Sequence, residues 1–233
     1  NLAGTRIDYA PFSGHKLYAP KGVGMLYVRS GAPYTPLMAG GGQEGGMRSG
    51  TENMAGIAAL GAVLQALLQG AFADHARLKN YRDALESSLR QAFPAIAFNA
   101  PLAQCLPTTL NFSVPDISSK TMLDVMDAAG LCVSAGSACS AAKSAPSYVL
   151  EAMGLPGWRT ASAVRMSFGA LVSAQDIDAA CKAIARCGEV LAARKRTPAS
   201  DVAPVNIAPQ SIEPVQELSW AELEPFLADN PDA

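Results

Sequence analysis

The chain has 233 residues, 49% of them hydrophobic and 16% charged, which predicts a folded core and excludes global disorder. Its formal net charge of -2 argues against nucleic acid or an anionic membrane as the main partner, and no apolar run is long enough to span a membrane. The five cysteines form no C-x-x-C pair, so we expect a reducing cytoplasm rather than a disulfide framework or a metal site.

The first third of the chain predicts two strands, a loop and a helix. Residues 5–12 and 23–29 are short apolar segments separated by turn residues, which is typical of strands. Residues 38–51, MAGGGQEGGMRSGT, are too rich in glycine for a regular element and are predicted to form a loop. Thr51 is the predicted N-cap of a helix that continues to about Gln69.

The middle of the chain predicts alternating helices and strands. A helix is expected over residues 73–92, where apolar side chains recur on one face. Strands are expected at 97–99 and 109–114, followed by a helix over 119–129. Residues 131–134 predict one more short strand, which leads into a loop of small residues.

Three further elements are expected before the chain changes character. Pro146 suits the first turn of a helix over residues 146–153, and residues 162–168 predict a strand. Ser173, with Asp176 three residues later, predicts a capping box at the start of a long helix to about Arg194. The irregular alternation of helices and strands predicts α/β or α+β layers rather than a barrel of repeats.

The end of the chain differs from the rest in composition. Residues 195–218 are rich in Pro, Ala and Val without periodicity, which predicts a linker. Residues 219–233 then open with Ser219 and Glu222 at the spacing of a capping box. This segment is too short to be a domain alone, so we expect it to be the start of one.

Lys16 follows the first predicted strand, directly after His15 in the sequence FSGHKLYAPKG. A lysine at the end of a strand is usually a solvated rim residue. The functional alternative is a lysine that forms a Schiff base with a carbonyl cofactor, with a pKa lowered by desolvation or neighbouring cations. His15 would then serve proton transfer or pack locally.

The loop over residues 38–51 combines six glycines with Arg48, Ser49 and Thr51. Free backbone amides, a guanidinium and hydroxyls at a helix start can bind an anion. The alternative is a flexible surface loop. The spacing of a P-loop, G-x-x-x-x-G-K-[ST], is absent.

Cys139 lies in VSAGSACSAAKSAPS, a stretch with too few large apolar residues to bury it. An exposed cysteine in such a loop is a candidate nucleophile. We expect Cys132, in a predicted strand, and Cys181 and Cys187, in the last helix, to be small core residues.

Arg165 interrupts the otherwise apolar predicted strand in VRMSFG. A buried guanidinium requires an anionic partner, because its charge is costly to bury alone. A substrate carboxylate held by a bidentate contact would serve, and so would a structural carboxylate of the protein.

These motifs together resemble one family. SGHK, GGGQEGGMRSGTEN, SAGSACS, PSYVLEAMGL and VRMSFG stand in the order seen in cysteine desulfurases, pyridoxal-phosphate enzymes of the class V aminotransferase type. The resemblance covers residues 5–191 and is to the branch with a short cysteine loop, which serves iron–sulfur cluster assembly and thiolation pathways. It implies the fold of the type I pyridoxal-phosphate transferases, an α/β fold.

The resemblance also implies a role for each site residue. Lys16 would form the Schiff base with pyridoxal 5'-phosphate and move the proton at the substrate Cα. Ser13 and His15 would hold the cofactor phosphate, and His15 would also handle protons; Thr51 would reach the phosphate of the other subunit of a homodimer. Arg165 would bind the carboxylate of L-cysteine. Cys139 would take the sulfur as a persulfide and pass it to an acceptor or scaffold protein.

The resemblance implies a division of the chain into parts. Residues 1–70 would be the end of the large cofactor domain, and residues 71–194 the small C-terminal domain with the cysteine loop. The linker, 195–218, would lead into residues 219–233, which weakly resemble the start of a rhodanese-like domain. The family's upstream cofactor ligands have no counterpart in the 15 residues before Lys16, so we expect the C-terminal part of a longer enzyme.

The chain departs from the family at one residue of the glycine-rich loop and in the missing upstream cofactor ligands, and these departures leave other functions open. Gly45 stands where the family usually has an arginine. A selenocysteine lyase or a related class V enzyme is the alternative within the class. A non-catalytic remnant or binding module is the alternative outside it, because the upstream cofactor ligands are missing.

Overall fold

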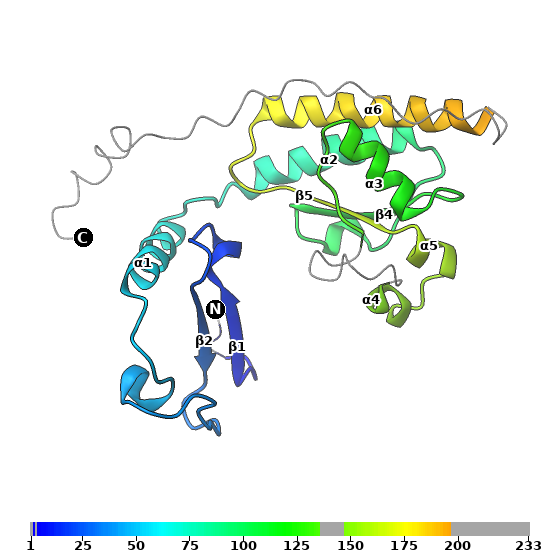
Figure 1. The fold of residues 1–233 in the computed structure, drawn as a ribbon. Coiled ribbons are helices and arrows are strands. Elements are labelled where there is room, and N and C mark those ends of the chain that lie inside the picture. The colour runs from blue at the N-terminus through cyan, green and yellow to red at the C-terminus, as the bar shows by residue number, and fades with distance from the viewer. Residues whose placement is uncertain (1, 3, 136–146, 197–233) are drawn as a thin grey trace. The chain divides into compact units, whose positions relative to one another are not determined.

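The computed structural model describes residues 2, 4–135 and 147–196, with side chains to residue 193 (Figure 1). It divides into two compact units, Asn1–Asp74 and His75–Ala233, each of which is described by itself. No helix in the described part of the chain is long and apolar enough to cross a membrane.

The first unit is built on an antiparallel hairpin. Strands β1 (Tyr9–Ser13) and β2 (Gly24–Val28) pair so that Ser13 lies opposite Gly24. A Cβ atom on Gly24 would lie 2.5 Å from the carbonyl oxygen of Phe12, so only glycine fits there. A 3-10 helix, η1 (Gly14–Leu17), occupies the connection and was not expected from the sequence. Strand β1 begins four residues later than predicted and β2 is one residue shorter at each end, although the amide of Arg29 still donates to the carbonyl oxygen of Asp8 at 2.8 Å.

Helix α1 (Met54–Leu68) begins two residues later than expected. Its N-cap is Asn53, whose side chain accepts a hydrogen bond of 3.1 Å from the amide of Gly56. The predicted N-cap, Thr51, is therefore wrong. Asparagine is among the strongest N-cap residues, and this bond gives one of the first helical amides a partner. The loop before α1 contains a second short 3-10 helix, η2 (Gln43–Gly46).

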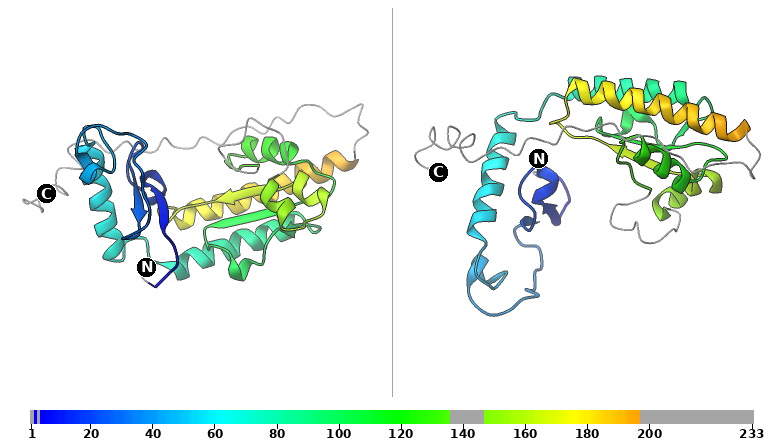
Figure 2. Two further views of the ribbon diagram at one scale, coloured as in Figure 1. Left: turned by 90° about the horizontal axis from the view of Figure 1, so that it is seen from below. Right: turned by 45° about the horizontal axis from the view of Figure 1, so that its top comes forward.

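The second unit is a three-stranded antiparallel sheet with helices against one face. The order is β3 (Ala97–Phe98), β4 (Thr109–Ser113) and β5 (Val164–Ser167). Helices α2 (His75–Ala92), α3 (Ser119–Ala128) and α6 (Ala174–Arg196) share its core, and α2 and α6 lie side by side in Figures 1 and 2.

Alternation along the central strand separates a core face from a polar face. Leu110 and Phe112 of β4 are fully buried and belong to the core shared with the helices. Asn111, between them, points to the other face, where it lies opposite Arg165 of β5. The sheet therefore carries its polar side chains on the face away from the main core.

Helix α6 begins as the sequence predicts. The hydroxyl of Ser173 accepts from the amide of Asp176 at 3.2 Å, and the Asp176 carboxylate accepts from the amide of Ser173 at 2.9 Å. The reciprocal capping box is confirmed. Bonding to Ser173 holds the pKa of the Asp176 carboxyl below its usual value.

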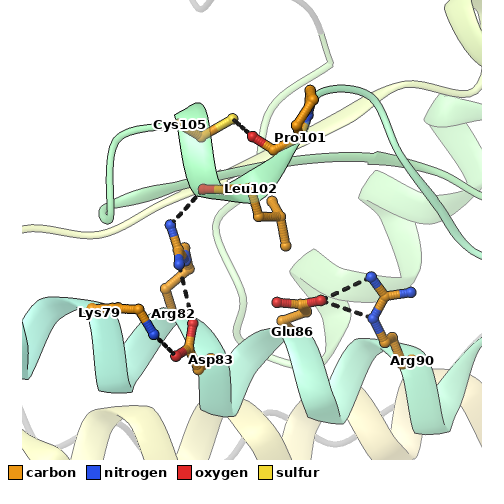
Figure 3. A network of polar contacts seen from close by, with 8 residues as sticks. All are labelled: Lys79, Arg82, Asp83, Glu86, Arg90, Pro101, Leu102 and Cys105. Carbon is orange, nitrogen blue, oxygen red and sulfur yellow. Dashed lines mark hydrogen bonds and ion pairs between the residues drawn. The ribbon is translucent and has the colours of Figure 1, made fainter.

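Polar contacts along α2 attach the short 3-10 helix η3 (Leu102–Gln104) to the unit (Figure 3). Arg82 is buried and donates to the carbonyl oxygen of Leu102 at 2.8 Å and to Asp83 at 3.2 Å. The hydrogen bond from Lys79 is the main cause that lowers the pKa of Asp83. Arg82 is thus a structural residue, although buried arginines often mark sites.

The segment before β5 departs from the prediction. Residues 131–134 form only an isolated bridge, Ser134 to Arg165, instead of a strand. Helix α4 (Tyr148–Ala152) is shorter than expected, and α5 (Gly157–Ala161) was not predicted. Five-residue helices show too little periodicity to be recognised in a sequence.

Candidate active site

Ser13, His15 and Lys16 lie together where β1 ends and η1 begins. Ser13 keeps an extended backbone, whereas His15 and Lys16 are consecutive residues of the 3-10 helix. With three residues per turn, consecutive side chains of η1 point about 120° apart. All three side chains are exposed, and none has a hydrogen-bond partner within the described part of the chain.

The backbone of this turn is held tightly. The amide of Gly14 donates to the carbonyl oxygen of Val23 at 2.9 Å, and the amide of Ala19 donates to the carbonyl oxygen of Gly14 at 3.1 Å. A Cβ atom on Gly14 would lie 2.8 Å from the Val23 oxygen, so this position requires glycine. Tyr18 ends the helix with a φ of 71°, and its ring centroid lies 4.6 Å from that of Phe72. The fold therefore presents Lys16 on a fixed turn.

The glycine-rich loop is also held by specific contacts. The hydroxyl of Ser49 donates to the carbonyl oxygen of Gly41 at 2.9 Å, and the side-chain oxygen of Gln43 accepts from the amide of Gly50 at 3.3 Å. Tyr34 donates to the carbonyl oxygen of Met47 at 3.0 Å. Glu44 adopts a φ of 51°, which is uncommon for a residue other than glycine. These contacts hold the loop in the conformation described, and its role as an anion-binding loop stays a prediction.

A hollow of about 650 Å³ lies in the first unit, between the hairpin, the loop and α1. Its lining is mostly apolar, with Glu44 and Arg48 as the charged residues. None of Ser13, His15, Lys16 or Thr51 lines it. We therefore place the candidate cofactor site at the turn and not in this hollow.

In the second unit, Arg165 lies on β5 and is half-buried. Its Nε atom is buried without a hydrogen-bond partner among the described residues. No protein carboxylate pairs with it in that part of the chain, so the structural alternative raised by the sequence finds no support there. Nε of Arg82 is also buried without a partner, but the terminal nitrogens of Arg82 bond to Leu102 and Asp83. The Arg165 guanidinium has no such bond among the described residues, which suits a site that an anionic ligand completes.

Arg165 is also joined to the start of the cysteine segment. Its amide donates to the carbonyl oxygen of Ser134 at 2.7 Å, and the amide of Ser134 donates back at 3.0 Å. Ser134 precedes Cys139 by five residues. Cys139 itself lies outside the described residues, as does Pro146.

The other cysteines divide by burial. Cys187 is fully buried, and burial raises the pKa of its thiol to about 11. Cys181 is half-buried against the core, and burial raises the pKa of its thiol as well. Cys132 is exposed, so its prediction as a core residue is wrong. Leu131 and Val133 on either side pack on the core, and in an extended segment the residue between them points outward.

The donor set of the turn fits pyridoxal phosphate. A lysine amine can bind its aldehyde, while a hydroxyl and an imidazole on the same turn can bind its phosphate. Gly14 leaves the turn no side chain at its closest approach to Val23. Ser13, His15 and Lys16 therefore suit this group, with Thr51 as an exposed hydroxyl at the end of the glycine-rich loop.

Asn99 and Asn111 are polar residues of the second unit that the sequence did not single out. Asn99 is buried and bonds to Asn111 at 2.7 Å. Asn111 in TLNFSV could have indicated a polar network, because an amide between two apolar residues of a strand needs polar partners when it is buried.

Comparison with known proteins gives consistent matches. The family model of the class-V aminotransferases matches residues 1–180 of the chain. The cysteine desulfurase IscS of Clostridium botulinum is 38% identical over 174 residues, 74% of this chain and 44% of that protein. The chain thus spans less than half the length of this relative.

Solved structures give the same picture. A NifS-like protein matches with a TM-score of 0.70 and 32% identity, covering 82% of this chain and 48% of that chain. A structure of SspA in complex with cysteine matches with a TM-score of 0.51 and 27% identity, covering 72% of this chain and 46% of that chain.

Proposed function

The chain belongs to the class-V aminotransferase family, and we propose that it forms part of a cysteine desulfurase. Its α/β fold is that of the NifS-like enzymes, a partial type I pyridoxal-phosphate fold. The proposed reaction converts L-cysteine to L-alanine and transfers the sulfur to a cysteine of the enzyme. The similarity to the structure of SspA in complex with cysteine supports this substrate.

The observation that carries the proposal is the state of Arg165. Its guanidinium is half-buried, and no carboxylate pairs with it and no group bonds to its Nε among the described residues, so it suits an anionic ligand. Its strand is bonded to Ser134, which leads toward Cys139. An arginine that suits a carboxylate is thus bonded to a residue that precedes a candidate thiol nucleophile by five positions in the sequence. This combination suits an amino acid with a thiol as the substrate.

Each residue has a defined task in this reaction. Pyridoxal phosphate, when bound, supplies the electron sink that the protein lacks. Lys16 would hold its aldehyde and later move the proton at the substrate Cα, while Ser13 and His15 would bind the phosphate. Thr51 would reach the phosphate bound by the partner subunit of a homodimer. Arg165 would fix the substrate by its carboxylate.

Sulfur transfer is assigned to Cys139. Its thiolate would attack the sulfur of the bound cysteine, forming an S–S bond as the substrate Cβ–S bond breaks. Protonation at Cβ completes alanine, and the persulfide remains on Cys139. A sulfur-acceptor or scaffold protein would then remove the sulfur, for iron–sulfur cluster assembly or thiolation. The four cysteines in the described part of the chain are free thiols, which is consistent with a reducing cytoplasm.

Product analysis of the complete enzyme tests the proposal. With pyridoxal phosphate and a thiol reductant, we expect L-cysteine to yield equal amounts of alanine and sulfide. A Lys16→Ala variant should lose the activity, whereas Lys21→Ala, an exposed lysine near the same turn, should keep it. Turnover of selenocysteine without turnover of cysteine would instead establish a selenocysteine lyase. Absence of both activities would favour a non-catalytic binding module.

A further inference from the structure

On the polar face of the three-stranded sheet lies a network of hydrogen bonds centred on Asn99. This residue is 3% exposed and directly follows β3. Its side-chain oxygen accepts from Nε of Arg159 at 2.8 Å. Its side-chain nitrogen donates to Oδ1 of Asn111 at 2.7 Å and to the hydroxyl of Ser113 at 2.9 Å. Both donors of the Asn99 amide are thus used, and its oxygen accepts from Arg159.

The network determines how the amide of Asn111 is oriented. A guanidinium only donates, so the oxygen of Asn99 must face Arg159 and its nitrogen must face Asn111. Asn111 therefore accepts with its oxygen, and its NH₂ group lies on the side away from Asn99. Asn99 is on the β3 side of β4, and β5 with Arg165 is on the other side.

The backbone shows that Asn111 and Arg165 are close neighbours. Arg165 exchanges both of its backbone hydrogen bonds with Ser134, and the carbonyl of Asn111 accepts from the amide of Asn99 at 2.8 Å. The two residues therefore face each other as a pair that is not bonded through the backbone. In such pairs the Cα atoms are about 4.5 Å apart and the side chains share one face.

We propose that Asn111 is a second donor for the carboxylate that Arg165 binds, and that Asn99 and Arg159 are positioning residues that orient it. The inference rests on the proposed function, in which Arg165 binds the substrate carboxylate. Two adjacent donors, the half-buried guanidinium of Arg165 and the oriented NH₂ group of Asn111, match the two oxygens of one carboxylate. The alternative is a purely structural role, in which Asn111 only accepts the hydrogen bond from Asn99.

The test uses acetate as the carboxylate probe and the cofactor-free form of the complete enzyme, so that the readout does not depend on turnover. Side-chain ¹H–¹⁵N resonances of Arg165 Nε and Asn111 Nδ2 are followed while acetate is added. We expect both resonances to shift along one saturation curve. Asn111→Ala should weaken acetate binding several-fold, because one donor is lost.

A second variant adds charge without removing the acceptor that Asn99 needs. Asn111→Asp keeps an oxygen toward Asn99 but places a carboxylate beside Arg165, and acetate affinity should fall by about tenfold or more. Asn80→Asp adds the same charge at an exposed position of α2 and should leave the affinity unchanged. Backbone amide spectra of each variant check that the unit is folded.

The outcomes separate this inference from the proposed function. A shift of Arg165 alone, with wild-type affinity in folded Asn111→Asp, overturns the role of Asn111 and leaves Arg165 as the binding residue. A shift of neither resonance overturns both carboxylate assignments. Shifts of both resonances in a protein whose complete enzyme does not turn over cysteine support the carboxylate site and contradict the desulfurase.

Discussion

Burial distinguishes the reactive side chains of this chain from one another. Lys16 and Cys132 are exposed, whereas Cys187 is fully buried and Nε of Arg165 is buried without a partner in the described part of the chain. Replacing a buried charged group costs more than replacing an exposed one, because its surroundings cannot rehydrate it. We therefore expect the largest effect on binding at Arg165.

Arg165→Lys should weaken the binding of L-cysteine to the complete enzyme by about 2–4 kcal/mol. Lysine keeps the charge but lacks the planar fork that binds both carboxylate oxygens. Titration calorimetry or the change in KM measures the loss. Arg90→Lys is the control, since Arg90 pairs with Glu86 on α2 and should not affect cysteine binding. Unchanged affinity in Arg165→Lys would make the arginine structural.

Thiol labelling should separate Cys132 from Cys187. Iodoacetamide at pH 8 should modify exposed Cys132 in the native chain and leave Cys187 unmodified, because it is buried and its pKa is about 11. Both should react after denaturation. Peptide mass spectrometry gives the extent at each site, and equal rates in the native chain would contradict the burial of Cys187.

At the residue scale, sequence patterns predicted the candidates that carry charge or a nucleophile. Lys16 and Arg165 were recognisable because each stands out from its apolar surroundings. Asn99 and Asn111 were not, because they are 12 residues apart and meet only through the register of β3 and β4. Cys132 was misjudged because alternation alone does not say which face of a short segment is buried.

At the scale of elements, one close helix contact limits the packing of the second unit. Helices α2 and α6 approach at Gly188, where a Cβ atom would lie 2.8 Å from the carbonyl oxygen of Ala92 and 2.9 Å from its Cβ. The nearest of these atoms is a backbone oxygen, and the Cβ is fixed to the same backbone, so neither can move aside easily. Glycine in mid-helix is unfavourable by itself, so the close approach explains its presence.

Gly188→Ala should lower the free energy of unfolding by about 1–2 kcal/mol, because overpacking exceeds the gain in helix propensity. The midpoint of urea unfolding measures the change. Gly157→Ala is the matched control in the same unit, since nothing lies within 4 Å of a Cβ atom there. A Gly188→Ala variant as stable as Gly157→Ala would show that the helices can separate at this point.

Most elements were predictable from the sequence, and their boundaries followed local chemistry. The capping box of Ser173 and Asp176 was readable because both partners are three residues apart. The start of α1 was not, because Thr51 and Asn53 are both good caps, and only the structure shows that the amide of Gly56 bonds to Asn53. The 3-10 helices and α5 were missed because they are short and held by tertiary contacts.

At the scale of the whole molecule, the first unit leaves much apolar surface uncovered. Helix α1 has no charged residue, and its side chains Met54, Ile57 and Leu68 are 68%, 42% and 90% exposed. Helices that are apolar on all sides are usually buried. The chain spans 44% of the length of its desulfurase relative, so further protein is available in such enzymes to cover this surface.

The 233-residue chain alone should self-associate and show no appreciable desulfurase activity. Exposed apolar surface favours association, and the exposed Lys16 would remain fully hydrated. Light scattering and alanine formation from cysteine with added pyridoxal phosphate test the two parts. A monomeric chain that produces alanine at the rate of the complete enzyme would show that it is self-sufficient.

The proposed desulfurase function depends most directly on where the sulfur goes. The complete enzyme with pyridoxal phosphate is incubated with L-cysteine, alkylated, digested and analysed by mass spectrometry for persulfides. We predict a persulfide on Cys139 in the wild type. In Cys139→Ser we predict none, with cysteine binding retained, because a hydroxyl cannot hold the transferred sulfur. Cys132→Ser, the exposed-cysteine control, should form the persulfide normally. Normal persulfide formation in Cys139→Ser, with Cys132 or Cys105 carrying the sulfur, would contradict the assignment of Cys139 as the residue that accepts the sulfur.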